Sequence, residues 1–275
     1  KQMKEKDLKK RLVKEKYGEV ALGKWRESSC CCCSSEIHRD DTITSFSQCY
    51  EGLPGYFDKA DLHIGCGIPT EFIGIKKGDV VLDLGSGAGN DCFLAHHLTG
   101  DAGKVIGLDF TDEMVDKAQE NKQQKGYQNI EFIKGDIENI PINDQEIDIV
   151  ISNCVLNLVP DKEKAFKEIY RVLKYGGVFS ISDMVIKGEL PDSIRDDAEL
   201  YVGCVAGAIQ LESYIDIIEK SGFDQPEIKN IKRVMVPVEI LVHYMTEDEI
   251  NEFRTGNTGI FSVTITASKT KKDGA

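Results

Sequence analysis

The sequence predicts an α/β protein whose mainly parallel sheet is covered by helices on both faces. Two observations lead to this fold class. Strand-like and helix-like segments alternate from residue 79 to residue 185, and the strand-like segments are almost wholly apolar. Alternation of this kind is typical of parallel strands joined by crossover helices. Strands that are covered on both faces read as near-continuous apolar runs, whereas strands of a half-exposed sheet alternate apolar with polar residues.

The predicted elements follow one another in a regular order. Helices are expected after the first, second and fourth strands, and those at 111–126 and 161–177 each end at a glycine. Thr111 or Asp112 would cap the start of the earlier helix, and Asp161 would cap the later one. Five strands are expected, at residues 79–84, 104–110, 129–136, 147–156 and 178–185.

The chain is expected to fold as three regions. Residues 1–64 form an N-terminal arm, with a helix followed by a mobile cysteine-rich loop. Residues 65–185 form the sheet domain, and residues 186–275 form a C-terminal α+β extension that is mainly helical to residue 222. Two later strand-like runs, at 226–240 and 259–269, would add an antiparallel edge pair and complete a seven-stranded sheet.

The N-terminal helix is predicted over residues 1–25. Its apolar residues Leu8, Leu12, Val13 and Tyr17 recur at a loosely helical spacing, so we expect them on one buried face. The function of residues 230–258 is not indicated by any motif.

Composition limits the possible functions. The chain has 34 basic and 47 acidic residues and a net charge of −13, which disfavours nucleic acid or an anionic membrane as the main partner. It shows neither an apolar secretory signal nor a stretch of membrane-spanning length. We therefore expect a cytoplasmic monomer that acts on a small molecule. In that compartment its nine cysteines would be thiols, ligands or redox groups rather than disulfides.

A glycine turn directly follows the first predicted strand. Gly85, Gly87 and Gly89 permit a tight turn and let a ligand approach the backbone. Asp109 ends the next strand, 20 residues beyond Gly89, where its carboxylate would suit a pair of ribose hydroxyls. This turn has two alternative interpretations. It could be a plain Rossmann turn with a helix-capping Asp, or it could be a dinucleotide site. The spacing is GxGxG rather than the GxGxxG of dinucleotide-binding proteins.

The arrangement favours S-adenosylmethionine, which places no pyrophosphate at the helix N-terminus. Asp83 is expected to face the ligand's ammonium group, and Asp136 is expected to accept a hydrogen bond from the adenine amino group. In an open α/β sheet, ligands bind beyond the carboxyl ends of the strands. We therefore predict a Rossmann-like class I methyltransferase domain. Its predicted cofactor-binding residues are Asp83, Gly85, Ser86, Gly87, Gly89, Asp109, Met114, Gly135, Asp136, Ile137 and Asn153.

Three isolated cysteines are candidates for a functional role. Cys66 lies in a glycine-flanked turn, Cys154 ends the fourth strand where it would face the methyl group, and Cys204 lies in a helical segment. A buried cysteine usually acts as a small apolar residue, and that interpretation stays open for each one alone. His63 could line the site, but no histidine forms an evident nucleophile–base pair. The pattern favours a soft substrate held by thiolates.

These motifs together resemble the arsenite S-adenosylmethionine methyltransferase family. The matching stretches include GCGIPTEFIGIKKGDVVLDLGSGAGNDCFLA, SNCVLNL and LYVGCVAGA, and they span roughly Gly65 to Gly222. The resemblance implies that Cys66, Cys154 and Cys204 hold trivalent arsenic, as arsenite or methylarsenite, while its lone pair attacks the methyl group. In that reaction no proton has to be removed, so proximity and orientation would carry most of the rate.

The resemblance also implies a fourth, relay cysteine within Cys30 to Cys33. It would form a disulfide with Cys66 and be reset by thioredoxin or glutathione as thiol reductant. We take Cys31 as the candidate, although four consecutive cysteines leave the choice open.

Two other functions fit parts of the sequence. A class I methyltransferase of a small organic metabolite would have the same strands, and it predicts that replacing the cysteines leaves activity intact. A non-catalytic thiol protein that binds soft metals predicts binding without turnover.

Overall fold

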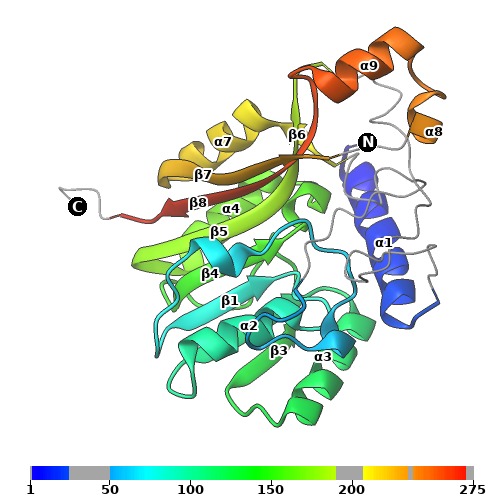
Figure 1. The fold of residues 1–275 in the computed structure, drawn as a ribbon. Helices are drawn as coiled ribbons and strands as arrows, with labels where there is room; N and C mark the ends of the chain where they lie inside the picture. Colours follow the sequence, from blue (N-terminus) through cyan, green and yellow to red (C-terminus); the bar gives the residue numbers. More distant parts are fainter. Residues whose placement is uncertain (1, 25–49, 190–206, 235–237, 271–275) are drawn as a thin grey trace.

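The computed structural model describes residues 2–24, 50–189, 207–234 and 238–270. Within them a single sheet has the strand order β3-β2-β1-β4-β5-β8-β7, and the two-residue strand β6 pairs with β5 (Figure 1). Neighbouring strands from β3 to β5 are parallel, while β8 is antiparallel to both β5 and β7. The strands are β1 Val80–Leu84, β2 Lys104–Asp109, β3 Ile130–Lys134, β4 Ile147–Asn153, β5 Leu173–Lys187, β6 Ile209–Gln210, β7 Asp224–Arg233 and β8 Gly259–Ser268.

Both faces of the sheet are covered, as the apolar runs predicted. Leu82 and Leu84 of β1 pack in one apolar cluster with α4 and α7, whereas Val81 packs in another with α2 and α3. Successive side chains of a strand point to opposite faces, so one strand supplies both clusters. The described helices are α1 Gln2–Ala21, α2 Asn90–Thr99, α3 Asp112–Lys125, α4 Lys162–Val172, α7 Leu211–Lys220, α8 Val238–Leu241 and α9 Glu247–Thr255, with short 3-10 turns at Asp58–Ala60, Pro69–Phe72 and Leu156–Leu158.

The predicted α/β fold, with its parallel core and antiparallel edge pair, is confirmed. The caps behave as expected in two places: the Asp161 carboxylate accepts a hydrogen bond from the Lys164 amide at 3.1 Å, and Gly126 ends α3 with φ 73°. Thr111 precedes α3, but its side chain makes no capping hydrogen bond. The division into three regions stays a prediction.

Several predicted boundaries were wrong. The strand expected over 147–156 ends at Asn153, so Cys154 follows β4, and the strand expected over 178–185 begins at Leu173. The helix expected over 161–177 ends at Val172, because Leu173 already pairs with Ile147 of β4 and the following backbone joins the sheet. The strand expected over 226–240 ends at Arg233, and α8 begins at Val238. At Leu173 long-range strand pairing overrides the local sequence pattern.

The buried face of α1 also differs from the predicted one. Leu8 and Leu12 are 45% and 42% exposed, whereas Val13 is buried among the residues at the carboxyl edge of the sheet. The helix therefore packs through a narrower apolar contact than its four apolar residues indicated, and other interactions must hold it.

The loop between β3 and β4 is fastened by Arg171 of α4. Its guanidinium donates to the carbonyl oxygens of Ile140 and Ile142, each at 2.8 Å, and it also pairs with Glu168 at 2.8 Å. The same loop contains Asp136, so these contacts also steady one edge of the candidate site.

We expect Arg171→Ala to lower the free energy of unfolding by about 1–3 kcal/mol, because the two carbonyl groups lose their charged donor. Urea unfolding of the variant measures this. Lys167→Ala, on the exposed side of the same helix, is the matched control and should change stability by less than about 0.5 kcal/mol. Equal effects of the two substitutions would contradict the role given to Arg171.

Candidate cofactor and thiol site

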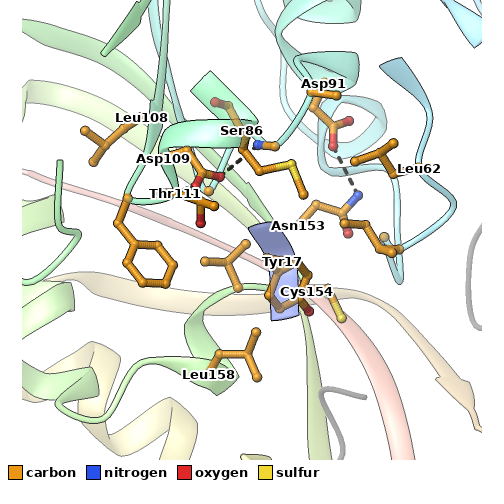
Figure 2. Close-up of a pocket in the computed structure, with 18 of the residues that line it drawn as sticks. Tyr17, Leu62, Ser86, Asp91, Leu108, Asp109, Thr111, Asn153, Cys154 and Leu158 are labelled. Atoms are coloured by element: carbon orange, nitrogen blue, oxygen red, sulfur yellow. Dashed lines mark hydrogen bonds between the residues drawn. The ribbon is translucent and has the colours of Figure 1, made fainter. Parts of the chain in front are cut away.

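A cavity lies at the carboxyl ends of the parallel strands, where the turn after β1 and the ends of β2, β3 and β4 meet (Figure 2). Its empty space is about 1120 Å³, part of it open to solvent. Helix α1 supplies the wall opposite the glycine turn, with Lys10, Val13 and Tyr17 lining the cavity. This position matches the binding crevice of open α/β sheets.

Most of the predicted cofactor residues come together here. Asp83 and Gly89 do not line the cavity. Those that line it are Gly85, Ser86, Gly87, Asp109, Met114, Gly135, Asp136, Ile137 and Asn153.

Asp109 fixes the shape of the glycine turn. One carboxylate oxygen accepts from the Gly87 amide at 3.0 Å, and the other accepts from the Thr111 amide at 2.9 Å. Burial raises the pKa of this carboxyl, while the two amides oppose the rise. Gly85 and Gly87 have φ of 70° and 51°, a backbone conformation that favours glycine. Each carboxylate oxygen can accept more than one hydrogen bond, so Asp109 can still bind a ligand's hydroxyl groups.

Asp83 was wrongly expected to face the ligand. Its side chain is 2% exposed and accepts a hydrogen bond from the Cys92 thiol of α2 at 3.2 Å. Burial, and then the neighbouring Asp91 carboxyl, raise its pKa well above the ordinary value. Gly89 likewise serves packing, since a β-carbon there would lie 2.7 Å from the Phe132 ring.

Asp91, in the first turn of α2, lines the cavity where Asp83 does not. It accepts a hydrogen bond from the Tyr50 hydroxyl at 3.0 Å. It accepts another from the Asn153 amide at 3.1 Å, which Figure 2 marks with a dashed line. Burial raises its pKa to about 6. The preceding residue, Asn90, also lines the cavity, and its buried side-chain oxygen has no hydrogen-bond partner among the described residues. Two adjacent acceptors of this kind suit a ligand's ammonium group.

Sequence reasoning missed Asp91, although it follows the glycine turn in GAGND. It also missed Tyr50. His63 does line the cavity, as the sequence indicated it could.

Helix α1 is held over the cavity by a row of lysines. Lys10 contacts Asp136 and Glu138 at 2.6 and 2.8 Å, just past the end of β3. These hydrogen bonds raise the pKa of Lys10, although partial burial acts in the opposite direction. The spacing of four residues places the lysines on one face of the helix. The pairs along α1 are Lys6–Asp161 at 2.8 Å, Lys10–Asp136 at 2.6 Å and Lys14–Asp112 at 3.0 Å.

The structure brings Cys66 and Cys154 into one apolar cluster. Cys154 lines the cavity and is 5% exposed, whereas Cys66 is 1% exposed and lies behind the lining. Cys154 has φ 59°, an uncommon conformation for a residue with a side chain. Cys204 and Cys31 lie outside the described residues. Within the described ranges, no group of three His, Cys, Asp or Glu side chains is placed to hold a metal ion.

A buried polar cluster lies close to the two thiols. Tyr214 donates to Asp183 at 2.9 Å. Burial raises the pKa of Asp183 to about 7 and lowers that of nearby Lys162 to about 8. Burial, and then Asp183, raise the pKa of Tyr214, and the charges of the Cys66 and Cys154 thiolates act in the same direction.

Among the helices of the described residues, none combines the length and the hydropathy that a membrane-spanning segment needs.

The fold and the cavity define a class I methyltransferase domain. A family model described as "Methyltransferase domain" matches residues 75–237, more than half of the chain. The arsenite methyltransferase of Halobacterium salinarum is 39% identical over 211 residues, which are 77% of this chain and 53% of that protein. The human arsenite methyltransferase is 40% identical over 157 residues, 54% of this chain and 42% of that protein.

A solved structure agrees with these relatives. The arsenic(III) S-adenosylmethionine methyltransferase of Chlamydomonas reinhardtii superposes with a TM-score of 0.63 at 33% identity, covering 76% of this chain and 68% of that one. The chain belongs to the arsenite methyltransferase family. It spans about half the length of the curated relatives it matches.

We expect Lys10→Ala to loosen α1, because Asp136 and Glu138 lose a partly buried partner. Amide hydrogen exchange in α1 should become about three- to tenfold faster, corresponding to about 1 kcal/mol. Arg11→Ala is the matched control, since Arg11 is 68% exposed and contacts only its neighbour Glu15, at 3.7 Å, among the ion pairs described. High salt should reduce the difference in the hydrogen-exchange rate of α1 between the parent and Lys10→Ala, because it screens the ion pairs. Unchanged exchange in Lys10→Ala would show that apolar contact alone holds α1.

Proposed function

We propose that this chain transfers a methyl group from S-adenosylmethionine to trivalent arsenic, as arsenite or methylarsenite. The observation that carries the proposal is the position of Cys154, whose side chain lies at the edge of the cavity beside the predicted cofactor residues. The relatives named as arsenite methyltransferases support the same substrate.

The residues around the cavity fit S-adenosylmethionine. Asp91 and the unpartnered oxygen of Asn90 suit its ammonium group, Asp109 suits the ribose hydroxyls, and Asp136 suits the adenine amino group. The cofactor supplies an electrophilic methyl group on a sulfonium. Helix α1 covers the adenine end through Lys10 and helps to exclude water.

The thiols have the task of holding the substrate. Cys66, Cys154 and Cys204 would replace the hydroxide or thiol groups on arsenic, because trivalent arsenic is soft and binds sulfur strongly. The arsenic lone pair is then the nucleophile, so no side chain has to remove a proton. The residues supply proximity and orientation, which can account for several orders of magnitude in rate.

Methyl transfer leaves arsenic formally pentavalent, and two electrons are needed to return it to the trivalent state. A relay through Cys31 and Cys66 would supply them by forming a disulfide. Thioredoxin or glutathione would then reduce this disulfide. A cytoplasmic location and a monomeric state belong to the same proposal.

The two alternatives explain less. A methyltransferase of an organic metabolite gives no role to the neighbouring thiols of Cys66 and Cys154. A soft-metal binding protein gives none to the cavity at the strand ends, with its glycine turn and carboxylates.

The direct test is methylation of arsenite by the purified protein with S-adenosylmethionine and a thiol reductant. Arsenic species are separated by chromatography with element-specific detection. The parent should form methylated arsenic, and Cys154→Ser should form less than about one hundredth as much, because the substrate loses a ligand that orients it. Cys92→Ser is the control, since Cys92 is buried in α2 against Asp83.

The outcomes separate the candidates. Methylated arsenic from the parent but not from Cys154→Ser supports the proposal. Tight arsenite binding without methylation would favour the soft-metal binding protein. Equal activity of parent and Cys154→Ser would point to an organic methyl acceptor or to other ligands.

Asp91 gives the cofactor site a pH dependence. An ammonium group prefers the carboxylate form, and the pKa of Asp91 without ligand is about 6. The dissociation constant for S-adenosylhomocysteine, which has the same ammonium group, should be constant above the pKa. It should rise about tenfold per unit as pH falls below it.

Calorimetric titration across this pH range measures the effect. Asp91→Asn should bind more weakly at neutral pH and lose most of the dependence. Asp101→Asn, at a fully exposed position, should behave like the parent. A parent dissociation constant that does not change with pH would contradict the role of Asp91.

A further inference from the structure

The side-chain amide of Asn153 lies between the cofactor cavity and the turn that carries Cys66. Its oxygen accepts hydrogen bonds from the backbone amides of Cys66 at 3.0 Å and Gly67 at 3.2 Å. Its nitrogen donates to the Gly67 carbonyl oxygen at 2.7 Å. The Asn153 side chain therefore bonds both N–H and C=O groups of the backbone at Cys66 and Gly67. Asn153 also directly precedes Cys154 in the chain.

The fit of this turn leaves little freedom. A β-carbon at Gly65 would lie 2.6 Å from the Asn153 amide nitrogen, closer than real β-carbons approach other atoms. The Cys66 carbonyl oxygen accepts a hydrogen bond from Ser262 of β8 at 2.6 Å. The position of the Cys66 thiol therefore depends on where the Asn153 amide holds the turn.

The same amide reaches the cavity. Its nitrogen also donates to Asp91 at 3.1 Å, the contact dashed in Figure 2. It donates to the Tyr50 hydroxyl at 2.5 Å as well. The Tyr50 hydroxyl is within hydrogen-bond distance of both the Gly67 carbonyl oxygen, at 2.9 Å, and Asp91, at 3.0 Å. Tyr50 is 3% exposed, so these contacts are shielded from solvent.

The side-chain nitrogen of Asn153 has more hydrogen-bond acceptors within reach than it has N–H groups. A primary amide has two N–H groups, and three acceptors lie within reach: the Gly67 carbonyl oxygen, the Tyr50 oxygen and Asp91. A cation at Asp91 competes for that carboxylate and leaves both N–H groups to the Gly67 and Tyr50 oxygens. The turn that carries Cys66 is then held more firmly.

We propose that Asn153 is a positioning residue that couples the two sites, so that cofactor bound at Asp91 strengthens arsenic binding at Cys66. The proposal rests on the proposed function, since it takes arsenic as the ligand of the thiols. Coupling between binding sites is reciprocal, so arsenic must strengthen cofactor binding by the same factor.

The test measures the dissociation constant of arsenite with and without saturating S-adenosylhomocysteine, which fills the cavity but has no methyl group to transfer. A phosphine reductant keeps the thiols reduced. For the parent, S-adenosylhomocysteine should tighten arsenite binding about tenfold, a typical size for coupling between sites. Arsenite should tighten S-adenosylhomocysteine binding by the same factor. The ratio to compare is that of the arsenite dissociation constants measured without and with S-adenosylhomocysteine. In Asn153→Ala this ratio should fall to about one, a change that simple loss of stability does not produce.

Asn129→Ala is the matched control. The Asn129 amide donates to the carbonyl oxygens of Gly100 and Gly103 at 3.0 and 2.9 Å, but it lies at the opposite ends of the strands. Its ratio should equal that of the parent. Tyr50→Phe removes the hydroxyl that contacts Asp91, Gly67 and Asn153 but keeps the Asn153 amide. Its ratio of arsenite dissociation constants should lie between those of the parent and Asn153→Ala. If Asn153→Ala does not fold, Tyr50→Phe decides the question.

The results also separate the two proposals. A parent ratio of one, or an Asn153→Ala ratio equal to the parent's, would overturn the coupling even if arsenite is methylated. A parent that shows the coupling but forms no methylated arsenic would retain the role of Asn153 and reject the methyltransferase activity. A parent that binds no arsenite would reject both.

Discussion

The hydrogen bonds of the Asn153 side-chain amide join parts of the molecule that are far apart in sequence. Asn153 ends β4, and its amide contacts the Cys66 turn, Tyr50 and Asp91. The position of β4 beside β1 and β5 is set by the parallel pairing of apolar strands. The strand pairing thus places the Asn153 amide between the turn that carries Cys66 and the cavity.

Charge is the second constraint on this site. Asp83, Asp91 and Asp109 are nearly buried around the glycine turn, and burial raises the pKa of each. A buried carboxylate without a cation is costly, so the cavity favours a ligand that carries positive charge. Lysines of α1 neutralise other carboxylates at the rim, which lets a helix with few buried apolar residues cover the cavity of an acidic protein.

The sequence was most informative where a local pattern has one physical meaning. Apolar runs predicted the parallel strands, and glycines beside a strand end predicted the turn that lines the cavity. The direction of the Asp83 side chain could not be predicted, because the packing of α2 and its Cys92 decides it. The lysines of α1 were present in the sequence, but their acidic partners lie about 100 or more residues further along the chain. The end of α4 was misplaced because Leu173 pairs with Ile147, a contact that no local pattern shows.

The backbone at Cys154 supports a role for its side chain beyond packing. With φ 59° the residue lies in the left-handed region, which costs a residue with a β-carbon about 1–2 kcal/mol and costs glycine almost nothing. Its amide donates to the Ser182 carbonyl oxygen at 2.7 Å, so the backbone of the residue after Asn153 is anchored to β5. Glycine would satisfy the backbone better, and an apolar residue would fill the cluster equally well. Because backbone strain of this kind clusters at functional sites, the conformation of Cys154 supports the role proposed for its thiol.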